Sequence, residues 1–168
     1  MNILNQKKAV SEAVAIALGS NSSDSQSIFE KAVQLLTAGG LTVEKISGSI
    51  ITAPVDCPPG TPDFINGALT GWFSGTACEL LELTQAVEQQ LGRPADHGFH
   101  MPRTLDLDII IFGSQIIRTS RLVIPHPAAQ ERYFVLAPLS EIAPEWIFPD
   151  SGMCVKDALL KLKNNKPY

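Results

Sequence analysis

The chain has 168 residues, a length typical of one domain, and 45% of its residues are apolar, which suffices for a hydrophobic core without disulfides or metals. No run of about 18 uncharged apolar residues occurs, and the polar residues 1–8 are not followed by an apolar segment, so we expect neither a membrane span nor a secretory signal. The net charge of −4 argues against a protein that coats nucleic acid.

The first two thirds of the chain predict four strands and two helices. Short apolar or alternating runs rich in β-branched residues indicate the strands, and apolar positions with a 3.6-residue period indicate the helices. In chain order we expect a strand over residues 12–18, a helix over 23–38, strands over 41–51 and 64–74, a helix over 77–91 and a strand over 105–112. Thr76 and Glu79 fit a capping box that begins the second helix.

Two irregular stretches, residues 52–63 and 92–104, are longer than common connections and are therefore candidates for functional loops. After residue 112, residues 115–124 can return as a hairpin strand, short helices with proline breaks follow, and a last amphipathic helix is expected over 155–163. The three cysteines, Cys57, Cys78 and Cys154, are scattered, which indicates reduced thiols and a cytoplasmic location.

The order strand, helix, strand, strand, helix, strand is that of the ferredoxin-like βαββαβ arrangement, an α+β fold. We expect an antiparallel sheet with both helices on one face. The C-terminal hairpin and helices would be an extension of that core. The predicted organisation is one domain over residues 12–168 after an N-terminal extension, residues 1–11.

The arginines are concentrated in one part of the chain. All five lie between residues 93 and 132, a window without lysine that also contains Asp106 and Asp108. Because the guanidinium group binds anions in a bidentate fashion, this window indicates a site for phosphate and a metal ion. Chance clustering of five residues is the alternative.

Asp106 and Asp108 flank Leu107 within a predicted strand. Side chains two residues apart point to the same face, about 6.5–7 Å from one another. Leu107, Ile109 and Ile111 would face the core on the opposite side. Two such carboxylates suit divalent cations, and Mg²⁺ binds through one or two carboxylates together with substrate phosphates. A solvated edge on which the aspartates pair with Arg103 and a neighbour is the other interpretation, and the spacing alone leaves both open.

The segment Pro102–Asp108, PRTLDLD, resembles the signature of the 6-hydroxymethyl-7,8-dihydropterin pyrophosphokinases. Several separate motifs in the right order are more specific than a single match. The other matching segments are 15–21 (AIALGSN), Ala53-Pro54 with 62–66 (PDFIN), Gln85, Glu88, Gly92 and Arg93, 122–126 (LVIPH), Arg132 and Phe134, and 138–145 (PLSEIAPE).

The resemblance implies transfer of diphosphate from ATP to 6-hydroxymethyl-7,8-dihydropterin in folate biosynthesis, with AMP and the pterin diphosphate as products. It implies two Mg²⁺ ions on Asp106 and Asp108, and Arg93 and Arg103 as catalytic residues that hold the ATP phosphates. The ATP-binding residues that it implies are Gln85, Glu88, Ile109, Arg121 and His126. The pterin-binding residues that it implies are Ala53, Pro54, Asp56, Phe64, Asn66, Arg132 and Phe134.

Among the pterin-binding residues, Phe64 and Phe134 would sandwich the ring, and Asn66 would hydrogen-bond its edge. The implied partners are ATP, the pterin and other folate-pathway enzymes, with no nucleic acid and no membrane. Residues 94–101 contain no arginine and no tryptophan, which family members often have there, and we expect altered ATP affinity or loop closure.

Two alternatives to this activity stay open. One is another Mg²⁺-nucleotide phosphotransferase or nucleotidyltransferase on the same scaffold. The other is a binding module that senses a nucleotide or a pterin.

Overall fold

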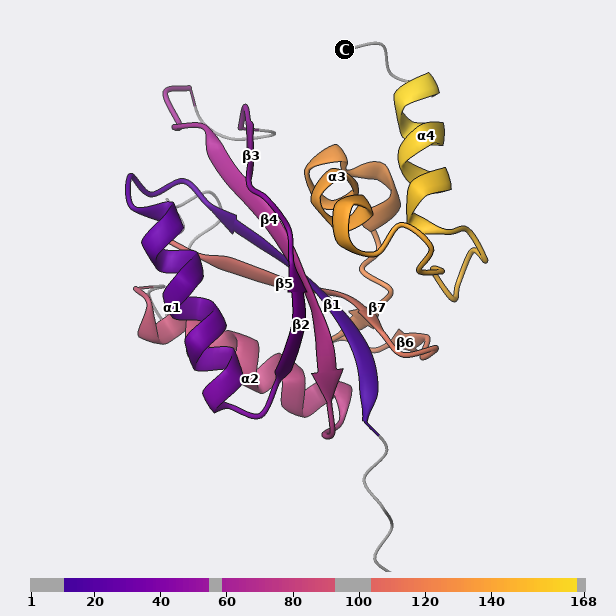
Figure 1. Cartoon of the computed structure of the whole chain (residues 1–168), viewed down its shortest axis with the longest axis horizontal. Coiled ribbons are helices and arrows are strands. Elements are labelled where there is room, and N and C mark those ends of the chain that lie inside the picture. Colours follow the sequence, from indigo (N-terminus) through magenta and orange to yellow (C-terminus); the bar gives the residue numbers. More distant parts are fainter. Residues whose placement is uncertain (1–10, 55–58, 93–103, 166–168) are drawn as a thin grey trace, which may run out of the picture.

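A five-stranded antiparallel sheet organises the chain (Figure 1). The computed structural model describes residues 11–54, 59–92 and 104–165. The strands are β1 (Glu12–Ser20), β2 (Thr42–Ile46), β3 (Ile50–Thr52), β4 (Phe64–Phe73) and β5 (Asp106–Phe112). Their order is β2-β4-β1-β5, and β3 also pairs with β4. This arrangement confirms the ferredoxin-like prediction.

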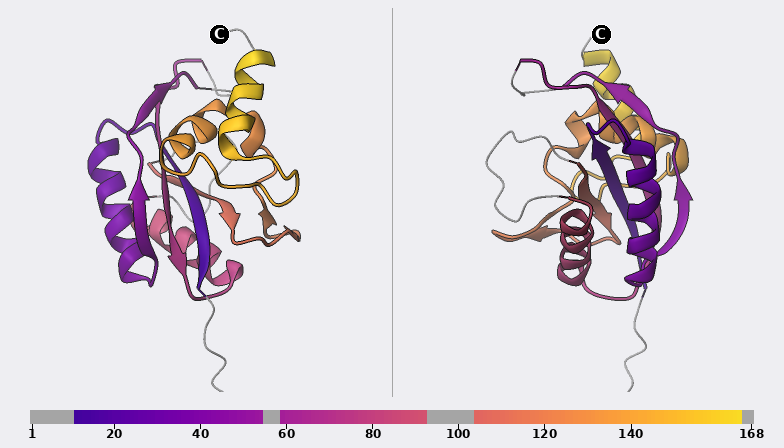
Figure 2. Two further views of the ribbon diagram at one scale, coloured as in Figure 1. Left: turned by 45° about the vertical axis from the view of Figure 1, so that its right-hand side comes forward. Right: turned by 90° about the vertical axis from the view of Figure 1, so that its left-hand side faces the viewer.

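The helices α1 (Ser25–Ala38) and α2 (Ala77–Gln90) cover one face of the sheet (Figures 1 and 2). Their apolar stripes meet Ile16 and Leu69 of the sheet in a first core. The predicted capping box of α2 is present: the Thr76 side chain accepts from the Glu79 N–H at 3.2 Å, and the Glu79 carboxylate accepts from the Thr76 N–H at 2.6 Å. Local periodicity and capping thus predicted both helices correctly.

The predicted strand over residues 41–51 is wrong as a continuous strand, because it bends between β2 and β3. The Ser47 N–H donates to the Ala68 carbonyl at 2.9 Å, while the Ser47 Oγ accepts from the Ala68 N–H at 2.8 Å. The next N–H, of Gly48, donates to the Glu141 carboxylate at 3.1 Å. The Ser47 hydroxyl therefore replaces a main-chain acceptor for the Ala68 N–H. Because the Gly48 N–H binds the distant Glu141 carboxylate, the chain bends at this point.

The C-terminal third forms the predicted extension of hairpin and helices, and it also contributes most of the residues of a second core. It contains the hairpin β6 (Ile117–Arg118) and β7 (Val123–Ile124), the short helix η1 (Ala129–Glu131), α3 (Tyr133–Ile142) and α4 (Val155–Asn165). The strands β6 and β7 pair with each other as a separate sheet and do not return along β5.

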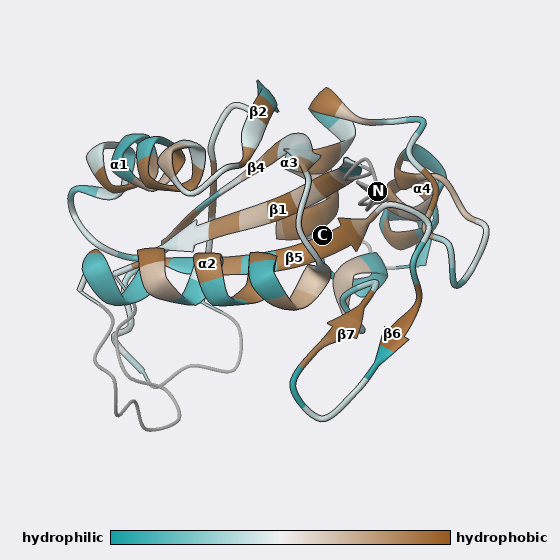
Figure 3. Cartoon of the chain, turned by 90° about the horizontal axis from the view of Figure 1, so that it is seen from below, coloured by the Kyte–Doolittle hydropathy of each residue, from teal (hydrophilic) through white to brown (hydrophobic). Residues whose placement is uncertain are grey.

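α3 packs against the second face of the main sheet. Small side chains such as Ala15, Ala17 and Ala68 on that face leave room for the helix, and they join Leu136 and Leu139 in a second core. Figure 3 shows apolar residues along β1 and β5, the strands between the two cores. The described chain contains no helix that is both long and apolar enough to cross a membrane.

A bulge in β5 corrects one predicted orientation. Ala15 pairs with Ile111 and Ile16 pairs with Ile109, so Ile110 is an extra residue. Ile109 belongs to the core beneath α1 and α2, whereas Ile111 belongs to the core beneath α3. Strict alternation had placed both on the same face, and the extra residue reverses that relation.

Replacing the fully buried Phe148 by alanine should reduce the free energy of unfolding by about 3–5 kcal/mol, because it opens a cavity in the second core. Urea unfolding followed by circular dichroism and by the fluorescence of Trp72 and Trp146 checks this. Leu160→Ala, at a position 57% exposed, is the control and should change the stability by less than about 0.5 kcal/mol. An unchanged urea midpoint for Phe148→Ala would show that packing in the C-terminal third does not contribute to the free energy of unfolding.

Candidate active site

The paired aspartates lie on the sheet face that α3 covers. Asp106 and Asp108 are the first and third residues of β5, and both are half-buried. Leu107 and Ile109 point to the opposite face, into the core beneath α1 and α2. The strand therefore presents two carboxylates side by side, as their spacing predicted.

Gly19 lies between Asp106 and Asn66 in one row across three strands. Asp106 pairs with Gly19, and Gly19 pairs with Asn66. A Cβ on Gly19 would lie 3.6 Å from the Asn66 Oδ1 and 3.9 Å from the Asp106 Cβ. Its φ is not in the left-handed region, so the backbone does not require glycine. A glycine inside a strand often marks a close approach of a ligand. The position of the missing Gly19 side chain is therefore taken as the floor of the candidate site.

The Asn66 carboxamide is held in a defined orientation. Asn66 is 5% exposed, and its Nδ2 donates to the Thr52 Oγ1 at 2.9 Å and to the Phe64 carbonyl at 3.4 Å. The Oδ1 is then the atom directed toward Gly19. Thr52, which no sequence motif indicated, belongs to β3 and reaches Asn66 because β3 pairs with β4.

His126 lies beside the carboxylates at the outer edge of β5. The main-chain N–H of His126 donates to the Ile110 carbonyl at 3.1 Å, and the ring Nδ1 accepts from the Ala128 N–H at 3.3 Å. The neutral ring therefore carries its proton on Nε2. Burial lowers the pKa of His126, Asp108 and Asp106 oppose that shift, and Arg132 reinforces it. Asp106, Asp108 and Arg132 all affect the pKa of His126, which places these charges in one small region around the imidazole.

Arg132 and Phe134 stand on either side of the first residue of α3. The Arg132 guanidinium carbon lies 5.6 Å from the centre of the Phe134 ring, a cation–π contact. Both side chains are half-buried. The contact holds a positive charge and an aromatic face together at the same end of the helix.

The residues predicted to bind the nucleotide are more dispersed. Gln85 is exposed on α2, and Arg121 in the β6–β7 turn lies 3.8 Å from the Glu82 carboxylate, which brings the hairpin tip beside that helix. Glu88 is 3% exposed, which excludes a solvated position for this residue, and its Oε1 accepts from the Leu107 N–H at 2.7 Å. The Ile109 side chain belongs to the core beneath α1 and α2, on the face opposite the aspartates.

Several predicted residues lie at the ends of the described segments or outside them. Arg93, Arg103 and Asp56 lie outside the described residues. Ala53 is exposed and Pro54 is half-buried, directly after β3. Phe64 begins β4 and is half-buried.

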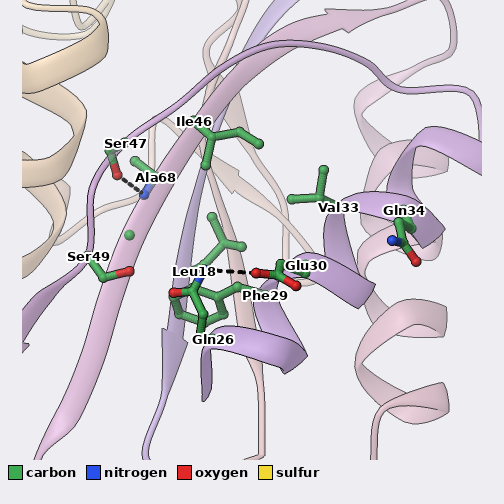
Figure 4. Close-up of a pocket in the computed structure, with 11 residues that line it drawn as sticks. Leu18, Gln26, Phe29, Glu30, Val33, Gln34, Ile46, Ser47, Ser49 and Ala68 are labelled. Atoms are coloured by element: carbon green, nitrogen blue, oxygen red, sulfur yellow. Dashed lines mark hydrogen bonds between the residues drawn. The ribbon is translucent and has the colours of Figure 1, made fainter. Parts of the chain in front are cut away.

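A cleft of about 340 Å³ lies elsewhere, between α1 and the bend that separates β2 from β3 (Figure 4). Phe29, Val33 and Ile46 line it together with polar side chains of α1. None of the residues predicted for ATP, metal or pterin binding lines this cleft.

The donor set of β5 fits Mg²⁺. Among the described residues no group of three or more His, Cys, Asp or Glu side chains could hold a metal ion. Mg²⁺ needs fewer protein ligands, because it keeps water and takes substrate phosphates as further ligands. Asp106 and Asp108 offer hard oxygen donors on one face, which suits an ion that arrives with a nucleotide.

The model of the 7,8-dihydro-6-hydroxymethylpterin-pyrophosphokinase (HPPK) family matches residues 15–144. The chain belongs to this family. The predicted resemblance is therefore confirmed over most of the chain, including all three residues of the row Asp106, Gly19 and Asn66.

Relatives with curated names support the assignment to the HPPK family. The 2-amino-4-hydroxy-6-hydroxymethyldihydropteridine pyrophosphokinase of Bacillus subtilis is 44% identical over 128 residues, which cover 76% of this chain and 75% of that protein. The protein of the same name from Synechocystis is 43% identical over 122 residues, 73% of this chain and 61% of that protein. The chain thus matches less than two thirds of the Synechocystis protein's length.

Solved structures support the fold. Wild-type HPPK-DHPS of Plasmodium falciparum with pteroate superposes with a TM-score of 0.73 at 12% identity, and the match covers 93% of this chain. The same match covers 43% of the Plasmodium chain, so this chain spans less than half of it.

We expect the His126 ring in the metal-free protein to titrate with a pKa below its ordinary value of 6.5, as measured by NMR. Asp108→Asn should lower that pKa further, and Arg132→Gln should raise it, because the two charges act in opposite directions. The stabilisation from burying the neutral ring is present above pH 6.5 and is lost as the pH falls through the lowered pKa. A pKa that neither substitution moves would contradict this placement of His126.

Proposed function

We propose that this chain transfers diphosphate from ATP to the hydroxyl group of 6-hydroxymethyl-7,8-dihydropterin, giving AMP and the pterin diphosphate for folate biosynthesis. The observation that carries the proposal is the row formed by Asp106, Gly19 and Asn66. It joins a carboxylate suited to a phosphate-bound cation to a carboxamide suited to a heterocycle, across a glycine that leaves room for substrate. Family membership supplies the reaction that these groups would serve.

Diphosphate transfer depends on positioning and on neutralising phosphate charge more than on covalent catalysis. Asp106 and Asp108 would hold Mg²⁺, and two ions are expected. When bound, the metal offsets the negative charge of the ATP phosphates. Arg93 and Arg103, assigned by family resemblance, would bind the phosphates and stabilise the transferred group.

His126 and Arg132 suit the phosphate side of the same site. A neutral His126 with its proton on Nε2 can donate a hydrogen bond to a phosphate oxygen, and its burial favours that neutral form. Arg132 would contribute a fixed positive charge near the diphosphate acceptor. Arg121 and the exposed Gln85 would contact the nucleotide from the hairpin and from α2.

The pterin would lie over Gly19, where the missing side chain leaves space between Asn66 and Asp106. The Asn66 Oδ1 can accept from ring N–H groups, since its Nδ2 is already bonded to Thr52 and Phe64. Phe64 and Phe134 would stack on the two faces of the ring, with Arg132 behind Phe134. Main-chain groups of Ala53, Pro54 and Asp56 would complete the recognition.

Two further expectations belong to this proposal. The HPPK-DHPS chain of Plasmodium falciparum joins HPPK to DHPS, which supports association with other folate-pathway enzymes. Among the described residues, Cys78 and Cys154 are free thiols, which fits the reducing cytoplasm.

An assay of the purified protein with ATP, Mg²⁺ and the pterin should release AMP only when the pterin is present, with diphosphate on the pterin. Asp106→Ala or Asp108→Ala should lower the rate more than about 100-fold while the fold survives, because the metal supplies several kcal/mol of charge stabilisation. Release of ADP or of free pyrophosphate would instead identify another phosphotransferase or a nucleotidyltransferase. Tight binding of ATP and pterin without turnover would identify a sensor.

Gly19→Ala should lower kcat/KM for the pterin about 10- to 100-fold, because its methyl group would occupy the floor of the site. The melting temperature should stay close to that of the wild type, since the added Cβ meets its neighbours at ordinary contact distances. Gly67→Ala is the matched control: its Cβ would face Phe29 on the opposite side of the sheet at 3.5 Å. Equal kinetic losses in the two variants would contradict the assignment of the floor.

A further inference from the structure

Two buried polar side chains hold the main chain where β5 begins. Ser20, at the end of β1, is fully buried, and its hydroxyl donates to the Thr104 carbonyl at 2.6 Å. Glu88, on the last turn of α2, is 3% exposed, and its carboxylate accepts from the Leu107 N–H at 2.7 Å. The two contacts come from different elements and enclose the segment 104–107, which contains Asp106.

These contacts reach main-chain groups outside the β1–β5 ladder. The ladder ends at the pair Gly19 and Asp106, so the Thr104 carbonyl lies beyond it. β5 is also the last strand of the main sheet within residues 11–54, 59–92 and 104–165, so no described strand pairs with its outer edge there. On that edge Glu88 accepts from the Leu107 N–H, three residues before the Ile110 carbonyl that accepts from His126. The strand that carries the aspartates is therefore held by side chains where strand pairing stops.

The Ser20 hydroxyl is itself held in place. The Thr104 carbonyl can only accept, so the Ser20 proton is directed to it. Ser20 Oγ accepts from the Ser22 N–H at 3.2 Å, and the buried Ser25 hydroxyl, at the start of α1, lies 2.8 Å away. Ser25 also contacts the Ser22 carbonyl at 2.6 Å. The turn after β1 and the start of α1 thus form one polar network with the residue that precedes β5.

We propose that Glu88 and Ser20 are positioning residues that hold segment 104–107 in place, so that the Asp106 and Asp108 carboxylates are oriented before substrate binds. The catalytic part of this inference rests on the proposed function. For Glu88 it replaces the nucleotide contact implied by family resemblance: the carboxylate acts through the Leu107 main chain and not on ATP. A buried acceptor whose bonded N–H lies between two metal-binding residues controls where both of them point.

Glu88→Gln and Glu88→Leu separate positioning from a direct role of the charge. Glutamine keeps an oxygen that can accept from the Leu107 N–H, whereas leucine has a similar size and no acceptor. We expect Glu88→Leu to lower kcat/KM about 10- to 100-fold and to raise the Mg²⁺ concentration for half-maximal rate, as losses of groups that orient metal ligands do. Glu88→Gln should restore both to within about threefold of the wild type. Ser20→Ala should resemble Glu88→Leu.

Amide hydrogen exchange, followed by NMR on the protein without metal or nucleotide, tests the same contacts independently of activity. The Leu107 amide should exchange at least about tenfold faster in Glu88→Leu than in the wild type, while central β1 amides such as that of Ile16 stay unchanged. Gln89→Leu, the exposed neighbour on α2, and Ser23→Ala, exposed beside the serine network, are the controls and should leave exchange and kinetics unaltered.

Loss of activity in Glu88→Gln as large as in Glu88→Leu, with the Leu107 amide still protected, would overturn the positioning role in favour of direct action of the charge. Unchanged Leu107 exchange in Glu88→Leu would overturn the contact itself. If the wild-type chain forms no pterin diphosphate, the proposed function fails, and the exchange measurement still decides whether Glu88 holds the strand.

Discussion

The pairing of β1 with β4 on one side and with β5 on the other creates the site. Neighbouring strands lie about 4.8 Å apart, and directly paired residues present their side chains on the same face. The register therefore brings Asp106, Gly19 and Asn66, which are far apart in the sequence, into one short row. A shift of one residue in either ladder would turn one of these side chains into the core beneath α1 and α2.

The C-terminal third completes both the core and the site, and it does so through the same packing. Alanines on β1 and β4 let α3 approach the sheet, and the segment that leads into α3 carries His126 and Arg132 to the aspartates. Burial then determines the chemistry of these groups. Because the buried imidazole loses hydration, His126 favours the neutral state even with Asp106 and Asp108 nearby. Burial of one side chain thus determines both its protonation state and the pH dependence of stability that it contributes.

Much of the fold was predictable from local patterns. The two helices, the capping box at Thr76 and the same-face placement of Asp106 and Asp108 follow from periods of 3.6 and 2 residues and from one capping rule. The bend at Ser47 was not predictable, because the Glu141 carboxylate that binds Gly48 lies far away in the sequence. The bulge at Ile110 and the second core also depend on distant partners. Family membership was predictable because the motifs occur in order, whereas the roles of Arg93, Arg103 and the other assigned residues stay predictions.

In the candidate site, too, some features were predictable from the sequence and others were not. Gly19 and Ser20 were visible in the sequence directly after the predicted strand over residues 12–18, yet their meaning depended on which residues pair with them across the ladder. By itself the sequence determined the helices α1 and α2, the carboxylate pair and the family, since these depend on local periodicity, capping and short motifs. Only the tertiary structure decided that Asn66 faces Asp106, that His126 is buried beside the carboxylates and that Glu88 binds the β5 main chain. The reason is physical: these contacts depend on strand register and helix packing between residues distant in the chain, and no local period encodes them.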